Sequence, residues 1–140
     1  MLGRFITFEG TEGAGKSTQI QLLAERLRAL GYDVLTLREP GGTVVGESIR
    51  SLLKSPDYAG QIAPVTELFL ISASRHELVE EHIRPALSAG QIVLCDRFID
   101  STIAYQGYGR GLPREALDDV ISFSVGGITP DATILLQIPL

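Results

Sequence analysis

Apolar runs alternate with amphipathic stretches along this chain, which predicts strands and helices in turn. Short apolar runs bounded by glycine, proline or polar residues are typical of buried strands. They occur at residues 5–8, 33–37, 91–95 and 131–138. Since helical stretches separate these runs, the strands are expected to lie parallel in one sheet covered by helices on both faces. The pattern therefore predicts a doubly wound α/β fold with four strands.

The remaining segments are predicted as helices and loops. Apolar side chains recur at helical spacing after residue 17, at Ile20, Leu23, Leu27 and Leu30. Further helices are predicted over 46–53, over 65–89 and from 113 onward. Pro85 is expected to kink or divide the long helix, whereas Pro113 suits a first helical turn. Loops are predicted at 38–42, 55–60 and 107–111, the last of them a mobile one.

The segment between the first predicted strand and helix carries the strongest chemical signal. It matches G-x-x-x-x-G-K-[ST], a phosphate-binding loop, in the strand–loop–helix context that this motif requires. Its residues are Gly10, Thr11, Glu12, Gly13, Ala14, Gly15, Lys16 and Ser17, with Thr18 next. Glycines let backbone N–H groups converge on one anion, while Lys16 is expected along the β- and γ-phosphates and Ser17 on Mg²⁺. We therefore predict a nucleoside triphosphate site in a fold of the P-loop NTPase type.

Composition narrows the class of protein further. The 140 residues suffice for one domain, and 44% hydrophobic with 21% charged residues is typical of a soluble globular protein. A net charge of −5 argues against nucleic-acid binding, and no apolar run is long enough for a membrane span, so we expect a cytoplasmic protein. The single Cys95 is expected to be buried in a strand, and His76 and His82 lack partners at zinc-binding spacing.

A phosphate-binding loop indicates that a nucleoside triphosphate binds, but it does not identify the reaction. The base-reading N-K-x-D motif of GTPases is absent, and Asp57 to Gly60 fits D-x-x-G without a preceding apolar strand. Asp96 and Arg97 are more informative, because they end the third predicted strand, where ligands of open α/β sheets collect. Asp96 is expected to organise Mg²⁺ and Arg97 to neutralise a transferring phosphoryl group; a surface ion pair is the alternative.

Three segments together resemble one enzyme family. They are residues 8–18, residues 38–43, and Asp96-Arg97-Phe98 with 101–110. In order and spacing they are similar to bacterial thymidylate kinases, which phosphorylate dTMP to dTDP with ATP and Mg²⁺. The resemblance implies that Lys16, Asp96, Arg97 and Glu12 are catalytic, with Ser17 and Asp96 as metal residues.

The resemblance also assigns residues around the acceptor phosphate and sugar. Glu12 would meet the 3′-hydroxyl of the acceptor, Arg50 would bind its phosphate, and Glu39 and Pro40 would line its pocket. The ring of Tyr105 would crowd the sugar 2′ position and exclude ribose. Each of these residues has a plainer alternative, as a solvated, turn or core residue.

The base end of the pocket departs from the family. An arginine matching Arg75 would hydrogen-bond the thymine carbonyl, and an aromatic ring one turn earlier would stack on the base. Here Ile71 holds that position, and Phe69 lies two residues away on another helix face. An isoleucine covers a base by apolar contact but has no π face. Thr102 would contact the pyrimidine edge, and Ser101 and Gln106 would line the same pocket. Phe69, Ile71 and Arg97 are also expected among the residues that bind the acceptor.

The last expectations concern the C-terminal end of the sequence, the substrates and the oligomeric state. The sequence stops at Leu140, just past the last predicted strand, where a doubly wound sheet normally continues. We expect residues 1–140 to form a single P-loop kinase domain without its fifth strand and its lid of catalytic arginines, so that a molecule ending there would bind nucleotide with little turnover. The resemblance implies ATP and dTMP as substrates and a homodimer that pairs through helices including the long one, which the mixed face at 77–83 allows but does not demand. A kinase with another nucleoside monophosphate acceptor and a non-catalytic nucleotide-binding module remain open.

Overall fold

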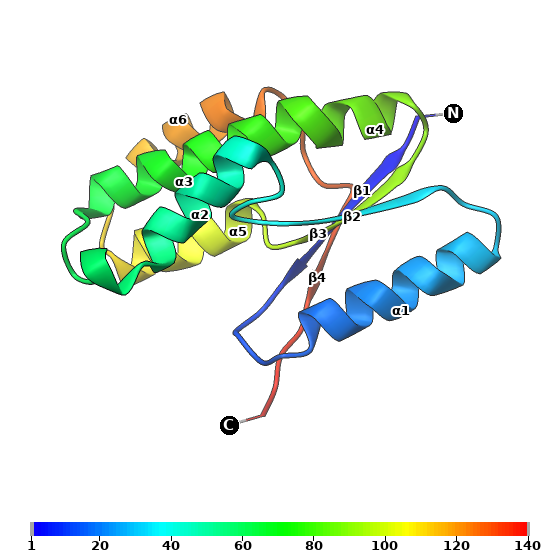
Figure 1. Ribbon diagram of the computed structural model, residues 1–140, viewed down its shortest axis with the longest axis horizontal. Coiled ribbons are helices and arrows are strands. Elements are labelled where there is room, and N and C mark those ends of the chain that lie inside the picture. The colour runs from blue at the N-terminus through cyan, green and yellow to red at the C-terminus, as the bar shows by residue number, and fades with distance from the viewer. Residues whose placement is uncertain (1, 140) are drawn as a thin grey trace.

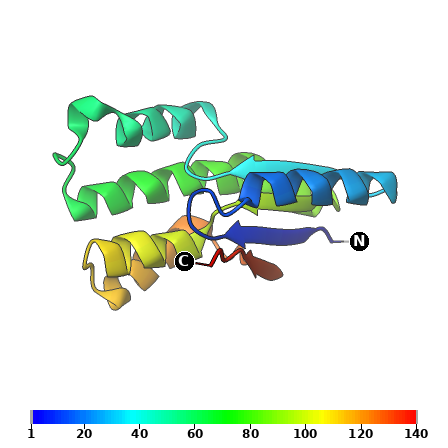
Figure 2. The same ribbon diagram turned by 90° about the horizontal axis from the view of Figure 1, so that it is seen from below.

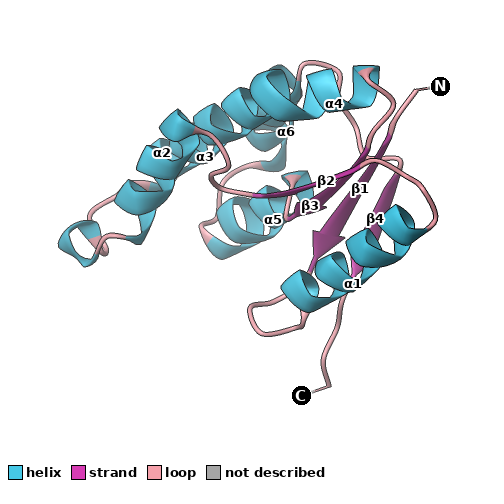
Figure 3. Cartoon of the chain, turned by 45° about the vertical axis from the view of Figure 1, so that its right-hand side comes forward, coloured by secondary structure: helices cyan, strands magenta, loops and turns pink. Residues whose placement is uncertain are grey.

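A computed structural model describes residues 2–139, with Met1 and Leu140 outside the described part. Its centre is a four-stranded parallel sheet in the order β2-β3-β1-β4. The strands are β1 (Arg4–Glu9), β2 (Val34–Arg38), β3 (Ile92–Asp96) and β4 (Ala132–Leu135). All four lie where the apolar runs predicted them, although β4 is shorter than the run at 131–138. The strands point the same way (Figure 3).

Helices cover both faces of the sheet, as predicted (Figure 1). The helices are α1 (Lys16–Ala29), α2 (Val44–Lys54), α3 (Pro64–Leu78), α4 (Arg84–Ser88), α5 (Ile99–Thr102) and α6 (Arg114–Val125). On one face, Ile20 and Ala24 of α1 pack with Phe8 and Leu94 of the sheet. On the other face, α3 and α6 bury a larger core. Burial of these apolar faces drives the fold, at roughly 25 cal/mol per Å².

Adjacent β1 and β3 place the chemically informative residues together. Their parallel register pairs Phe8 with Asp96, so both strands end at the same edge of the sheet. The chain leaves β1 toward α1 on one face and leaves β3 toward α5 and α6 on the other. Neighbouring strands whose connections diverge open a crevice at their carboxyl ends.

The long helix predicted over 65–89 is interrupted before Pro85, as expected. A π-helical turn, η2 (Val79–Ile83), separates α3 from α4, and Pro85 is the second residue of α4. Proline lacks an N–H, and its ring clashes with the carbonyl four residues earlier, which is that of Glu81. Because Glu81 lies inside the π-helical turn, the wider turn accommodates the proline without ending the helical run.

The loop predicted at 107–111 is wrong for its first three residues. A π-helical segment, η3 (Ile103–Gly109), continues α5 and runs beside α3, shown in yellow and green in Figure 2. Gly107 is a packing residue, since a Cβ there would lie 2.8 Å from Leu117 Cδ1 of α6. Only Gly111, with φ +75°, has the left-handed backbone that favours glycine. The glycines of this segment therefore serve helix packing as well as the turn.

Candidate nucleotide-binding site

The loop between β1 and α1 has the backbone of a phosphate cradle. Gly10, Gly13 and Gly15 have positive φ angles of 144°, 78° and 93°. A Cβ on Gly10 would lie 2.5 Å from the Leu136 carbonyl oxygen, so no larger residue fits there. Lys16 Nζ donates hydrogen bonds of 3.0 Å to the carbonyl oxygens of Gly10 and Thr11. Since an ammonium group has three protons, one donor remains for a phosphate oxygen.

Ser17 and Asp96 meet across the crevice. Ser17 Oγ donates to Asp96 Oδ2 at 3.3 Å, joining the first turn of α1 to the end of β3. The other carboxylate oxygen, Asp96 Oδ1, is buried without a hydrogen-bond partner among the described residues. A hydroxyl beside a carboxylate with a spare oxygen is the type of donor set that Mg²⁺ prefers. The predicted metal residues therefore fit the ion.

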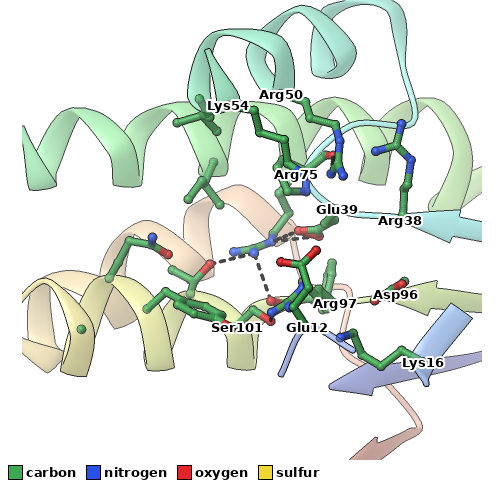
Figure 4. Close-up of a pocket in the computed structure, with 18 of the residues that line it drawn as sticks. Glu12, Lys16, Arg38, Glu39, Arg50, Lys54, Arg75, Asp96, Arg97 and Ser101 are labelled. Atoms are coloured by element: carbon green, nitrogen blue, oxygen red, sulfur yellow. Dashed lines mark hydrogen bonds and ion pairs between the residues drawn. The ribbon is translucent and has the colours of Figure 1, made fainter. Parts of the chain in front are cut away.

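A cavity of about 940 Å³ opens at this edge of the sheet. Most of the predicted site residues line it: Glu12, Gly13, Gly15, Lys16, Ser17, Thr18, Glu39, Pro40, Arg50, Ile71, Arg75, Asp96, Arg97, Ser101, Thr102, Tyr105 and Gln106. Gly10, Thr11 and Ala14 belong to the loop but are not among the lining residues. Figure 4 shows Glu12, Lys16 and Arg97 gathered at one end, with Arg50 and Lys54 entering from α2. The cavity thus brings the donor loop and the predicted acceptor residues into one space.

Phe69 is the exception among the predicted pocket residues. Its side chain is 58% exposed, and it is not among the residues that line the cavity. Ile71 does line the cavity. The reason is helical geometry, because residues two apart on α3 point about 200° apart around its axis. The assignment of Phe69 to the pocket is therefore wrong.

Glu39 and Arg75 form a buried ion pair in the wall of the cavity. Arg75 Nε lies 2.7 Å from Glu39 Oε1, and both side chains are almost fully buried. Arg75 Nη2 donates to Thr102 Oγ1 at 2.8 Å and to the Phe98 carbonyl at 3.2 Å. Burial raises the pKa of Glu39 to about 7, although the Arg75 charge lowers it. The pair fixes the arginine side chain in one position.

One nitrogen of that arginine is left without a protein partner. Arg75 Nη1 is buried and donates to no hydrogen-bond acceptor among the described residues. A buried, unsatisfied donor is costly, and it gains most when a ligand supplies an acceptor. Because Arg75 lines the cavity, a ligand carbonyl there would satisfy it.

Arg97 lies near the phosphate loop in a strained conformation. Its φ of 71° is the one positive φ among the non-glycine residues that the structure describes. Arg97 Nη1 donates to Ser101 Oγ at 3.3 Å, and the guanidinium carbon lies 5.2 Å from the centroid of the Tyr105 ring. Both Arg97 and Lys16 line the same cavity, so the two cations face one space.

Sequence reasoning missed part of the basic rim. Arg38 and Lys54 also line the cavity, alongside Arg50. Burial and the nearby charge of Arg38 lower the pKa of Arg50, and Arg50 Nη1 donates to the Pro40 carbonyl at 2.8 Å. Like charges held together favour an anionic ligand. Arg38 directly follows the strand predicted at 33–37, and Lys54 lies one helical turn after Arg50. Both signals were available in the sequence.

Other expectations concern residues outside the cavity. Cys95 is fully buried in β3, as predicted, and burial raises its pKa well above the usual range, which keeps the thiol protonated. Among the described residues, there is no group of three or more His, Cys, Asp or Glu side chains that could hold a metal ion. Within residues 2–139, none of the helices is long and apolar enough to cross a membrane.

A glycine loop joining β1 to α1, at the carboxyl edge of a parallel sheet, defines a P-loop nucleotide-binding fold. The sequence model of the thymidylate kinase family matches residues 8–140, and the chain belongs to that family. This confirms the resemblance and the fold class predicted from the sequence.

Individual relatives are similar over almost the whole chain. It is 53% identical to a thymidylate kinase of Exiguobacterium sibiricum over 99% of its length, and 59% identical to one of Chlorobium luteolum over 95%. These matches cover 65% and 61% of the two relatives. A crystal structure of thymidylate kinase from Ehrlichia chaffeensis is similar at a TM-score of 0.89 and 42% identity, over 98% of this chain and 72% of that one. The chain thus spans under two thirds of the length of these two curated relatives.

Proposed function

We propose that the protein transfers a phosphoryl group from ATP to dTMP and forms ADP and dTDP, in the cytoplasm. The observation that supports this most directly is the single cavity lined both by Lys16 of the phosphate loop and by Arg75 with its unpaired Nη1. Such a space would hold two nucleotides end to end. The relatives named above carry the name of this activity.

The donor end would act through position and charge. The N–H groups of the glycine loop and the free proton of Lys16 would hold the β- and γ-phosphates, as the N-terminus of α1 adds partial positive charge. Ser17 and Asp96 would hold Mg²⁺, which neutralises phosphate charge when bound. Arg97, which lines the same cavity, would contact the acceptor phosphate and stabilise charge on the group in transfer.

The acceptor end would select dTMP by complementary contacts. Arg50, with Arg38 and Lys54 beside it, would bind the acceptor phosphate. Glu12 would meet the 3′-hydroxyl, and Arg75 Nη1 would donate to a base carbonyl. Thr102 Oγ1 accepts from Arg75, so its contribution to base recognition would pass partly through that arginine. Ile71 would cover the base by apolar contact.

A coupled assay of ADP release across dTMP, dUMP, dCMP, dGMP and UMP tests the proposal on the protein at its natural length. We expect the highest kcat/KM with dTMP, and no ADP release without an acceptor. Lys16→Ala should lower kcat as well as ATP affinity, because it removes a phosphate contact that persists in the transition state. A protein that binds ATP but never releases ADP in response to an acceptor would be a binding module instead, and a preference for UMP would point to another kinase.

We also propose a homodimer that pairs through α3 and α6 and does not use the apolar residues at 77–83. Leu78, Val79 and Ile83 of the mixed face at 77–83 are fully buried inside the subunit and therefore cannot form it. Phe69 of α3 and Phe123 of α6 are 58% and 90% exposed on two helices that pack together. Sedimentation analysis should give a dimer that Phe123→Ser weakens; a monomer at every concentration would refute this proposal.

A further inference from the structure

Glu9, the last residue of β1, is a buried carboxylate that the proposed mechanism does not use. It is 6% exposed and does not line the cavity. One carboxylate oxygen, Oε1, accepts from the Phe98 backbone N–H at 2.8 Å, and the other, Oε2, accepts from Ser101 Oγ. Both partners lie in the segment that follows β3, far along the chain from Glu9.

The two partners of Glu9 flank Arg97. Phe98 N belongs to the peptide unit that follows the positive φ of Arg97, and Ser101 Oγ accepts from Arg97 Nη1. The peptide unit before Arg97 is held as well, since Arg97 N donates to the Phe8 carbonyl at 2.9 Å. The end of β1 therefore restrains the strained backbone of Arg97 on both sides and its guanidinium through Ser101.

We propose that Glu9 is a positioning residue that holds Arg97 in its left-handed conformation and directs the guanidinium at the phosphate of the acceptor nucleotide. The inference rests on the proposed function. Glu9 directly precedes Gly10 of the phosphate loop, so Glu9 would fix the position of Arg97 relative to that loop. Burial raises the pKa of Glu9 above its usual value, and the hydrogen bonds from Ser101 and Phe98 offset part of this rise because they favour the charged form.

The test compares dTMP with thymidine, which lacks the phosphate, as probes in calorimetric titrations. Glu9→Leu keeps the volume and removes both acceptors. We expect it to weaken dTMP binding about 30-fold or more, and to change thymidine and ATP binding less than about 3-fold. Glu9→Gln, whose amide oxygen still accepts from Phe98 N, should retain dTMP affinity within about 5-fold of the natural protein. The exposed Glu115→Leu is the matched control for loss of charge.

A double-mutant cycle separates positioning from general support of the fold. If Glu9 acts through Arg97, Glu9→Leu should cost less than about 3-fold in dTMP affinity once Arg97 is alanine. Equal losses in both backgrounds, or equal losses for dTMP and thymidine, would overturn the inference. Should Glu9→Leu not fold, Ser101→Ala removes one arm of the contact and should still weaken dTMP more than thymidine. A natural protein that binds no dTMP at all would instead refute the proposed function.

Discussion

Ser17 Oγ and Asp96 Oδ2 lie 3.3 Å apart, although 79 positions separate them in the chain. The contact joins the start of α1 to the end of β3, which are brought together because β1 and β3 are neighbours in the sheet. It places a hydroxyl and a carboxylate with one unpaired oxygen beside the phosphate loop. The metal chemistry that we propose depends on this juxtaposition.

Asp96→Asn should therefore weaken the dependence of the reaction on Mg²⁺. The amide keeps the volume and can still contact Ser17, but it removes a charge that attracts the cation. We expect kcat to fall about 100-fold, with a higher Mg²⁺ concentration for half-maximal rate, and ATP binding without Mg²⁺ to change less than about 3-fold. A titration of the rate against Mg²⁺ measures both effects. An unchanged Mg²⁺ dependence would show that Asp96 acts elsewhere.

The Glu39–Arg75 pair should make stability depend on pH in a defined direction. The pKa of Glu39 is raised from 4.5 to about 7 by burial, so the folded chain binds this proton more tightly than the unfolded chain. The contribution of Glu39 to stability is therefore full below about pH 4.5 and is lost as the pH rises through 7. The free energy of unfolding of the natural protein minus that of Glu39→Gln should fall by up to about 3 kcal/mol between pH 5 and 8.

Urea denaturation of both proteins at pH 5, 6, 7 and 8 measures this difference. Glu39→Gln is the matched reference, because its side chain has the same size and cannot titrate. A difference that instead grows with pH would mean that attraction to Arg75 outweighs burial and that the pKa of Glu39 is lowered.

Gly10→Ala should disrupt the phosphate loop. A Cβ at this position would lie 2.5 Å from the Leu136 carbonyl oxygen, a backbone atom that cannot move aside easily, and the φ of 144° adds strain. We expect ATP affinity to fall at least about 30-fold and the protein to lose about 2 kcal/mol or more of stability. Gly60→Ala is the matched control, since its φ of 73° is also positive but its Cβ would meet nothing within 4 Å. Equal effects of the two substitutions would show that strain alone is responsible.

Much of the fold could be predicted from the sequence, because it depends on local patterns. The strands follow from apolar runs, and the phosphate loop follows from glycine spacing before Lys16. The loop predicted at 107–111 was wrong for residues 107–109, because Gly107 packs against Leu117 of the next helix, a tertiary contact that no local pattern reports. The role of Glu9 was missed for the same reason. An acidic residue at the end of a strand is ordinary until the fold brings Phe98 N to it.

The residues of the site were likewise predicted only in part from the sequence. Most residues of the phosphate loop, and those named after β3, line one cavity as expected, whereas Arg38 and Lys54 were missed although their positions could be read from the sequence. Phe69 was included as an aromatic residue close to Ile71, although its spacing already placed it on another helix face, and its side chain is exposed. The buried pair of Glu39 and Arg75 becomes visible only when the fold brings the residue that follows β2 against Arg75 of α3.

Tyr105 provides the last prediction, on selectivity for deoxyribose. Its ring lines the cavity with Arg97 stacked against it, and it is 48% exposed, so its edge is available to a ligand. If the ring excludes a 2′-hydroxyl by occupying its space, Tyr105→Ala should raise kcat/KM for UMP relative to dUMP by about 10-fold or more. Tyr105→Phe keeps the ring and should leave this ratio within about 2-fold. The two acceptors share the same base, so the comparison isolates the sugar. If Tyr105→Ala lowers both rates equally and leaves the ratio unchanged, the ring supports Arg97 and does not select the sugar.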